Sequence, residues 1–449
     1  MSSSVQYAKP GGALDARIFR AALSVSLAGV VVKLAATLKE AAVAGVYGRS
    51  DAMDAYLVAA LVPGLLVNLI AESMNQALIP TLIRVREQEG YERAQQLFSS
   101  SMLWICALLT VVSCAMAASA SEFFPLIASH FAGPKLTLSI HLFYGLLPTV
   151  LLAGIASNCA AVLNAQERFA LPALAPAAIS GSAVAGVLVF GARAGIWAMV
   201  WATLAGTALY ALVLAGMLPA HGYRLRLRWH GRTLAMREVA HQYRSILLSG
   251  VVASGGLVVD QAMAAMLPAG SVSALVYANR FVSVALMLLA GALSTALTPH
   301  FSRLVAARDW PACRRVLHNW AGFAALVSIP VAILLIASSQ GLVRIAFQRG
   351  AFGAGDTAVV ARVLRMYAVQ IPFFAVSRVF YRFLLAMRRA DLILGCGTLN
   401  LVLDIVLNFV LMRWMGVAGI ALATSLWTVA TLLFLGFWAH RVLGRANAA

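Results

Sequence analysis

Long apolar stretches dominate the sequence and limit what it can fold into. Most of them are about 20 residues or longer, which is enough for a helix to cross a ~30 Å hydrocarbon core. No segment of ~10 residues alternates apolar and polar side chains, as the strands of a membrane barrel do. Helices satisfy their own backbone hydrogen bonds in lipid, so the sequence predicts an all-α polytopic membrane protein with about twelve transmembrane helices. The predicted spans are residues 20–46, 52–82, 98–120, 137–163, 170–191, 194–217, 244–266, 272–298, 317–338, 358–385, 392–412 and 416–440.

The scarcity and placement of charge support lipid as the solvent. Charged residues make up only 11% of the chain, against about 25% in a soluble domain. The formal net charge of +18 would suggest nucleic-acid binding in a soluble protein. With the N-terminus in the cytoplasm, however, 22 of the 34 lysines and arginines fall on the cytoplasmic side and eight on the other. This distribution follows the positive-inside rule. We therefore expect a bacterial inner-membrane protein with both termini cytoplasmic and no nucleic-acid partner.

The longest polar stretch divides the chain into two halves. Residues 218–243 are rich in arginine and separate six spans in residues 1–217 from six in residues 244–449. The second and eighth spans end alike, because Pro80 and Pro299 are each followed four residues later by an arginine. Two halves in the same topology predict a parallel repeat, the architecture of carriers whose site lies between two lobes. The basic stretch is either a plain cytoplasmic linker or a contact for anionic headgroups.

Proline interrupts several predicted spans. Pro63 breaks the second span, Pro172 and Pro176 open the fifth, and Pro372 breaks the tenth. Proline removes a helical hydrogen bond and bends the helix. In a carrier such bends act either as hinges or as ordinary packing kinks, and both interpretations are kept.

No arrangement of residues points to catalysis. The sequence contains no phosphate-binding glycine loop and no acidic pair typical of a glycosyl-transfer site, and its histidines fall in loops or near span ends. The five cysteines lack metal-ligand spacing and are expected to be small core residues. We therefore expect a protein that is not an enzyme and needs no cofactor or metal.

Ionisable side chains inside the predicted spans carry the main functional signal. A charge at mid-bilayer costs at least ~2.5–3.5 kcal/mol on insertion scales, so it needs a partner or a wet cavity. Lys33 and Lys39 lie in the first span, and Arg280 lies in the eighth. Ammonium and guanidinium groups both suit phosphate, so these cations predict a pyrophosphate site; static salt bridges are the alternative. Other ionisable residues within spans are Glu40, Asp54, Glu72, Asp260, Arg378 and Asp404. Arg378 is either a further site residue or snorkels to the cytoplasmic edge.

The second span carries a polar stripe. Asn68, Glu72 and Asn75 are spaced four and three residues apart, which places them on one helical face. The stripe is interpreted either as the lining of a cavity or as a hydrogen-bonded seam between helices.

Several motifs, taken in order, resemble the MurJ/MviN family of lipid II flippases. The resemblance covers most of the chain in register, and its strength lies in the order and spacing of the motifs. The matching segments are residues 39–48 (KEAAVAGVYG), 54–56 (DAY), 71–80 (AESMNQALIP), 164–169 (NAQERF), 270–280 (GSVSALVYANR) and 347–352 (FQRGAF).

The resemblance implies a fold, a cargo and a set of site residues. The family belongs to the multidrug, oligosaccharidyl-lipid and polysaccharide exporter superfamily, which implies two pseudo-symmetric six-helix lobes. Its members are proposed to flip an undecaprenyl-pyrophosphate-linked peptidoglycan precursor by alternating access through a basic cavity. Lys33, Lys39 and Arg280 occupy positions where the family places basic residues, two of them lysines where arginine is usual. Asn68 lies in a region of the second span where the family usually has arginine.

The leading hypothesis is a monomeric flippase for a polyprenyl-pyrophosphate-linked saccharide, either lipid II or a related lipid-linked oligosaccharide. Its membrane-lipid surroundings would hold the polyprenyl tail while the headgroup crosses. Two alternatives stay open: an exopolysaccharide or O-antigen-type flippase that does not act on lipid II, and a cation-coupled multidrug exporter centred on a buried acid. In the leading hypothesis the pyrophosphate binds Lys33, Lys39 and Arg280, and the cavity is supported by Glu40, Asp54, Asn68, Glu72 and Asp260.

Overall fold

The computed structural model describes residues 12–131, 133–231 and 233–448, and every regular element in these ranges is a helix. Lys9 and Arg232, two of the 22 basic residues assigned to the cytoplasmic side, lie outside the described residues. The first half contains α1 (Gly12–Tyr47), α2 (Asp51–Leu66), the π-helix η1 (Val67–Ala71), α3 (Glu72–Gln88), α4 (Tyr91–Ala118), α5 (Ala120–Ile127), α6 (Gly133–Ala165), α7 (Ala170–Leu174), α8 (Ala177–Ala194) and α9 (Trp197–Met217). The segment between the halves begins with η2 (Pro219–His221). The second half contains α10 (Leu234–Ala265), which starts within that segment, α11 (Ser271–Ala306), α12 (Trp310–Phe347), α13 (Ala354–Ala368), α14 (Gln370–Ala386), α15 (Ala390–Met415) and α16 (Val417–Ala448).

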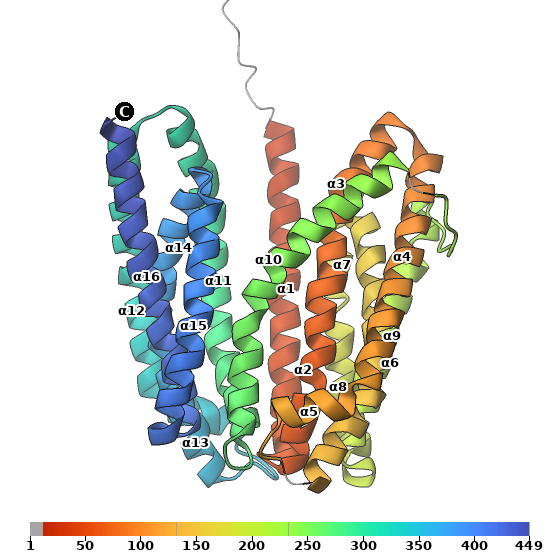
Figure 1. Cartoon of the computed structure of the whole chain (residues 1–449), viewed down its shortest axis with the longest axis vertical. Helices are drawn as coiled ribbons and strands as arrows, with labels where there is room; N and C mark the ends of the chain where they lie inside the picture. The colour runs from red at the N-terminus through yellow and green to blue at the C-terminus, as the bar shows by residue number, and fades with distance from the viewer. Residues whose placement is uncertain (1–11, 132, 232, 449) are drawn as a thin grey trace, which may run out of the picture.

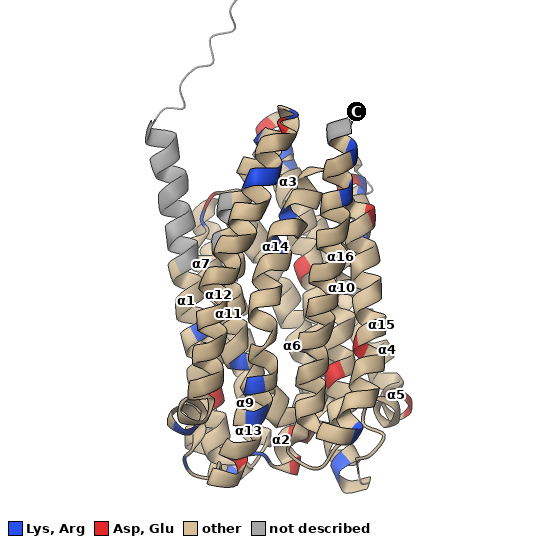
Figure 2. Cartoon of the chain, turned by 90° about the vertical axis from the view of Figure 1, so that its left-hand side faces the viewer, with Lys and Arg blue, Asp and Glu red and all other residues tan. Residues whose placement is uncertain are grey.

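These helices confirm the prediction of an all-α polytopic membrane protein. Within the described ranges, ten segments are long and apolar enough to cross a bilayer, counting α2 to α3, α7 to α8 and α13 to α14 as single segments. Two more predicted spans correspond to α1 and α10, which are 36 and 32 residues long. Figure 2 shows that lysine, arginine, aspartate and glutamate gather mainly toward the two ends of the helices, with few between. A bilayer therefore matches the apolar middle of the molecule.

The helices form two lobes, as the sequence and its family resemblance predicted (Figure 1). In the first lobe α6 packs against α2, α3, α4 and α9, and α1 packs against α8. In the second lobe α14 packs against α11, α12 and α16. Helix α10 contacts both α3 and α15, and in Figure 1 it crosses the space between the lobes. The first described turn of α1 and the last turn of α16 lie at the same end of the molecule, at the top of Figure 1.

The hydrophobic cores differ between the two ends of the molecule. At the end away from the termini, one buried cluster passes through both lobes and joins Val43 to Tyr277 and Phe352. Nearer the termini each lobe has a cluster of its own, with Phe98 in the first lobe and Phe301 in the second. The lobes are therefore packed together at one end and packed separately at the other.

Proline lies close to each break in the long helices. Pro63 precedes the π-helix η1, where the wider turn disturbs the regular backbone hydrogen bonds. The hydroxyl of Ser157 in α6 donates to the Ala71 carbonyl at the end of this turn, at 3.0 Å. Pro176 separates α7 from α8, and Pro372 lies in the first turn of α14 just after the break from α13. The breaks are confirmed, and their role as hinges stays a prediction.

The basic segment between the halves is bonded to the first lobe. Gln95 of α4 makes two hydrogen bonds with the backbone of Arg224, at 2.8 and 2.9 Å. The backbone N–H of His230 donates to the Ser100 hydroxyl at 3.1 Å. Residues 234–243, which were expected in the linker, form the first turns of α10. This segment therefore follows the surface of α4 before the chain turns into α10.

We expect Gly350→Ala to lower the thermal stability of the protein. Gly350 has a φ of +57°, and an added Cβ would clash with the carbonyl oxygen of Gly45 across the lobe junction. Backbone strain of this kind costs about 1–3 kcal/mol. A thermal unfolding curve of the detergent-purified protein should show a lower midpoint. Gly355→Ala is the matched control, because its Cβ meets nothing within 4 Å. Equal midpoints for the two variants would contradict the close approach at Gly350.

Candidate functional site

Two of the predicted cations meet on one carboxylate between the lobes. The Oε1 atom of Glu40 lies 3.1 Å from Nζ of Lys39 and 2.7 Å from Nη2 of Arg280. Glu40 and Lys39 belong to α1 and Arg280 to α11, so the cluster joins the two lobes. The Glu40 side chain is only 3% exposed, whereas those of Lys39 and Arg280 are 25% and 22% exposed. A buried acid therefore holds two cations that remain partly accessible.

One carboxylate cannot neutralise two cations, so the cluster keeps an excess positive charge. Arg280 also has spare donor capacity, because its Nε atom is buried without a hydrogen-bond partner among the described residues. A guanidinium offers five N–H donors in a planar fork that fits phosphate. The cluster therefore has both the charge and the free donors that a phosphate group requires.

Lys33 lies on the same helix, six residues nearer the termini, in a different setting. Its side chain is half-buried and forms no ion pair with the described residues. The neighbouring Leu34 and Leu38 are 65% and 60% exposed. The structure thus brings Lys39 and Arg280 together and leaves Lys33 as a separate cation more than one turn away.

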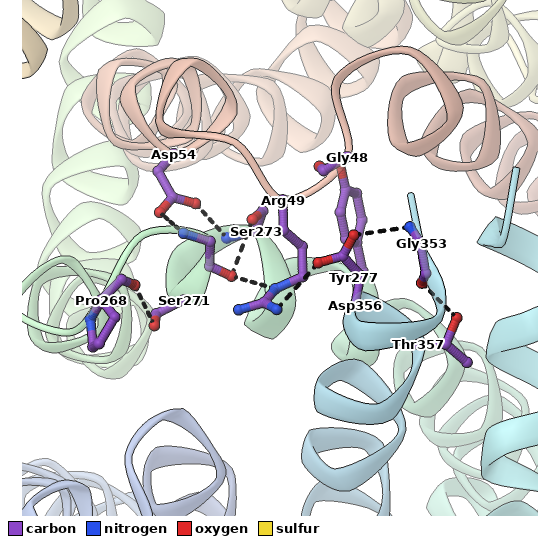
Figure 3. A network of polar contacts seen from close by, with 11 residues as sticks. Gly48, Arg49, Asp54, Pro268, Ser271, Ser273, Tyr277, Gly353, Asp356 and Thr357 are labelled. Carbon is purple, nitrogen blue, oxygen red and sulfur yellow. Dashed lines mark hydrogen bonds and ion pairs between the residues drawn. The ribbon is translucent and has the colours of Figure 1, made fainter. Parts of the chain in front are cut away.

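Asp54, which was expected to support the cavity, lies in a junction between the lobes (Figure 3). Its two carboxylate oxygens accept the backbone N–H groups of Gly270 at 2.7 Å and Ser273 at 2.9 Å. The Gly270 N–H belongs to the N-cap residue of α11 and the Ser273 N–H to its first turn, where unpaired donors and the helix dipole favour a negative charge. Asp54 is 2% exposed. A carboxylate of the first lobe therefore caps a helix of the second.

Arg49 and Tyr277 add further bonds across this junction (Figure 3). Nε of Arg49 donates to the Gly270 carbonyl at 2.9 Å, and its Nη1 lies 3.3 Å from Oδ1 of Asp356. The Tyr277 hydroxyl donates to the Gly48 carbonyl at 3.1 Å. These contacts coincide with the core cluster shared by both lobes. Polar and apolar contacts together hold the lobes closed at the end away from the termini.

The polar stripe of the second span is divided between two environments. Asn75 is buried and donates to the Ser157 carbonyl of α6 at 3.0 Å, so it belongs to a seam between helices. Asn68 in η1 and Glu72 at the start of α3 are exposed, and neither makes a hydrogen bond or ion pair with the described residues. Each interpretation of the stripe therefore fits part of it.

Asp260 belongs to a second buried polar cluster, inside the C-terminal lobe. The Asn408 amide donates to Asp260 at 2.8 Å and to Asp404 at 3.2 Å, and the Thr424 hydroxyl lies 3.4 Å from Asp260. Oxygen atoms of this kind suit a hard cation, although no group of three His, Cys, Asp or Glu side chains that could hold a metal occurs among the described residues. Asn408 and Thr424 were not among the predicted site residues. The spacing of Asp404 and Asn408 by four residues was the available signal.

Arg378 is separate from both clusters. Its guanidinium carbon lies 4.4 Å from the ring centre of Phe374 and 5.5 Å from that of Tyr381. Its Nε atom is buried without a partner among the described residues, and no ion pair joins it to an acid there. Stacking on aromatic rings stabilises the guanidinium without neutralising its charge.

The chain is similar to known membrane transporters over most of its length. The family model described as lipid II flippase MurJ matches residues 43–447. This match begins just after Glu40 and includes Asp54 and Arg280. A lipid II flippase MurJ from Burkholderia cenocepacia is 26% identical over 434 residues, which are 93% of this chain and 83% of the relative.

Solved structures share the fold. A lipid II flippase MurJ in an inward closed conformation aligns with a TM-score of 0.79 at 21% identity, covering 92% of this chain and 86% of that one. A multidrug resistance transporter of the MATE family and MOP superfamily, in an inward-facing conformation, aligns with a TM-score of 0.77 at 11% identity, covering 95% and 99%. The family model accounts for nearly the whole chain, and we conclude that this protein belongs to the lipid II flippase MurJ family.

Proposed function

We propose that the protein flips an undecaprenyl-pyrophosphate-linked glycan precursor from the cytoplasmic to the periplasmic leaflet of the inner membrane. The cargo in this proposal is lipid II or a related lipid-linked oligosaccharide, and the relative from Burkholderia cenocepacia carries the name lipid II flippase. The observation that carries the proposal is the sharing of Glu40 by Lys39 and Arg280, one cation from each lobe. The protein moves its cargo as a monomer and makes or breaks no covalent bond.

Headgroup binding in this mechanism is an exchange of anions. In the empty carrier Glu40 holds Lys39 and Arg280, which lowers the cost of burying three charges in a medium of low dielectric constant. An arriving pyrophosphate offers more charge and more acceptor oxygens than one carboxylate does. It takes over Arg280 in a bidentate arrangement and Lys39 as a point charge. Lys33, which has no partner among the described residues, adds a third cation on the side of the termini.

Alternating access follows from the contrast between the two ends of the lobes. With both termini in the cytoplasm, the junction of Asp54, Arg49 and Tyr277 lies on the periplasmic side and closes it. The cytoplasmic side has separate cores, so the headgroup enters there, past the exposed Asn68 and Glu72. Release then requires the junction to open while the cytoplasmic ends approach each other. The polyprenyl tail stays in lipid throughout.

The moving bodies in this proposal are residues 1–217 and 244–449, joined by residues 218–243. Gln95 and Ser100 tie the joining segment to the first lobe. Helix α10 contacts α3 as well as α15. Rocking of the lobes therefore changes the packing of α10 more than the path of the linker.

We expect Lys39→Ala and Arg280→Ala each to slow flipping by about tenfold or more, because each removes a charge-assisted bond worth about 1.5–3 kcal/mol. The measurement is the flipping rate in reconstituted vesicles, supported by rescue of a strain depleted of its lipid II flippase. Arg280→Lys should fall between the parent and Arg280→Ala, since it keeps the charge and loses the fork. Arg413→Ala serves as the control, because this arginine stacks on Phe409 in the last turn of α15 and does not belong to the Glu40 cluster. Full flipping activity of Arg280→Ala would contradict the proposal that the pyrophosphate binds Lys39 and Arg280.

Asp54→Asn is expected to open the junction. The amide keeps the size of the side chain but loses the charge that caps α11. The equilibrium constant between joined and separated lobes should therefore shift about tenfold toward separated lobes. The distance between spin labels at Ser129→Cys and Ala358→Cys, both exposed, measures this in a chain whose five natural cysteines are replaced. The labelled protein should show a larger population at long distance.

Asp51→Asn is the matched control for this variant. Asp51 is an exposed acid on the same helix that pairs with Lys135 at 2.6 Å. It forms no contact with the first turn of α11 comparable to that of Asp54. Identical distance distributions for Asp54→Asn and Asp51→Asn would show that the cap does not hold the lobes together.

The second candidate function is cation-coupled export of small molecules, which the pair of the half-buried Asp260 and the buried Asp404 favours. A carboxylate pair that shares one amide donor suits the binding of a proton or a hard cation. Under the flippase proposal, cells with and without the chain should accumulate a fluorescent organic cation equally. Export that depends on the chain and is abolished by Asp260→Asn would favour the exporter instead.

A further inference from the structure

A pocket separate from the Glu40 cluster lies inside the C-terminal lobe. Its volume is about 570 Å³, and the described residues that line it belong to α14, α15 and α16. Pockets of this size hold small organic ligands. Lys39, Glu40 and Arg280 lie on α1 and α11, so the pocket shares no residue with the proposed headgroup site.

The pocket is amphipathic. Most of its wall is apolar, with Phe374, Ile393 and Leu435 among the lining side chains. Leu385 and Leu394, which also line it, are 41% and 55% exposed and mark its open side. A hydrocarbon chain in this pocket would contact apolar side chains, as it contacts apolar lipid tails in the bilayer.

The single charged residue among the described lining residues is Arg378. Its guanidinium is stacked on Phe374 and Tyr381, and its Nε atom is buried without a partner in the described part of the chain. A cation inside a membrane-spanning helix is costly unless an anion or water reaches it. The pocket therefore offers a charge that the described side chains leave uncompensated.

Several hydrogen-bond donors in the pocket have no protein oxygen as acceptor among the described residues. The hydroxyls of Ser377, Thr428 and Thr431 already donate to protein oxygens, at 2.8, 2.8 and 2.9 Å. The Asn400 carbonyl oxygen accepts the hydrogen bond from Thr431. The Asn400 amide nitrogen has only a weak contact with the Cys396 sulfur, at 3.9 Å. Among the described lining residues, the donors without a protein oxygen as acceptor thus include Nε of Arg378, the Asn400 amide and the buried Nε1 of Trp427. A ligand that fits them carries acceptor oxygens and negative charge.

We propose that this pocket binds a lipid phosphate, with its phosphoryl oxygens on Arg378 and Asn400 and its hydrocarbon chain along Phe374, Ile393 and Leu435. The guanidinium fork matches phosphoryl oxygens, and the apolar wall and open side suit a chain that enters from the bilayer. The site stands independently of the cargo that crosses between the lobes. It holds a lipid phosphate while the Glu40 cluster is empty or loaded.

Native mass spectrometry of the detergent-purified full-length protein tests the site. The probes are dioleoyl phosphatidate, dioleoyl phosphatidylcholine and glycerol 3-phosphate. We expect phosphatidate to bind most tightly, because choline balances the phosphate charge of the second probe and the third has no chain. Arg378→Gln should weaken phosphatidate binding by about tenfold or more. Gly397→Phe, which places a ring in the wall of the pocket, should have a similar effect.

Matched variants separate this site from general lipid adhesion and from the flipping mechanism. Arg413→Gln removes another arginine stacked on a phenylalanine of the same lobe and should bind phosphatidate as the parent does. Arg378→Lys should retain most of the binding, which also shows that position 378 tolerates replacement. Arg280→Ala should bind phosphatidate normally even where it no longer flips cargo. Equal phosphatidate affinity of Arg378→Gln and Arg413→Gln, or equally tight binding of glycerol 3-phosphate, would overturn the proposal.

Discussion

The cost of placing charge in a membrane governs this molecule. A buried ion in a medium of low dielectric constant must be paired, hydrated or neutralised. The protein meets this constraint at Glu40 by letting one carboxylate serve two cations from different lobes. In the proposed mechanism, the same constraint would allow the pairing to be exchanged. A cluster with excess positive charge can form within the fold and still attract a more highly charged anion. A fully neutralised ion pair would attract such an anion only weakly.

The two ends of the lobes are held by different kinds of contact. Away from the termini, a continuous apolar core is reinforced by Asp54 and Arg49, whose bonds to the backbone at Gly270 need a fixed geometry. Near the termini each lobe buries its own apolar cluster. Hydrogen bonds that need a fixed geometry form or break together. A junction held by such bonds is therefore expected to switch between discrete states.

The C-terminal lobe carries polar groups that the shared cluster does not use. Asp260 and Asp404 share the Asn408 amide in the interior of the lobe, and Arg378 faces a separate pocket between α14, α15 and α16. Both lie away from α1. The excess positive charge between the lobes and the acid pair within one lobe are thus spatially separated.

The sequence by itself determined the class of fold, the approximate spans and the types of charge within them. Length and apolarity were enough, because a helix is the structure that satisfies its backbone in lipid over such distances. Prolines such as Pro63 also marked the breaks, since the missing N–H acts locally. Only the tertiary structure decided which charges meet. Lys39 and Glu40 are neighbours in sequence, but Arg280 joins them from 240 residues away, and Asp54 turned out to cap α11. Such pairings depend on the rotation and approach of helices from different lobes, and periodicity within one helix does not contain that information.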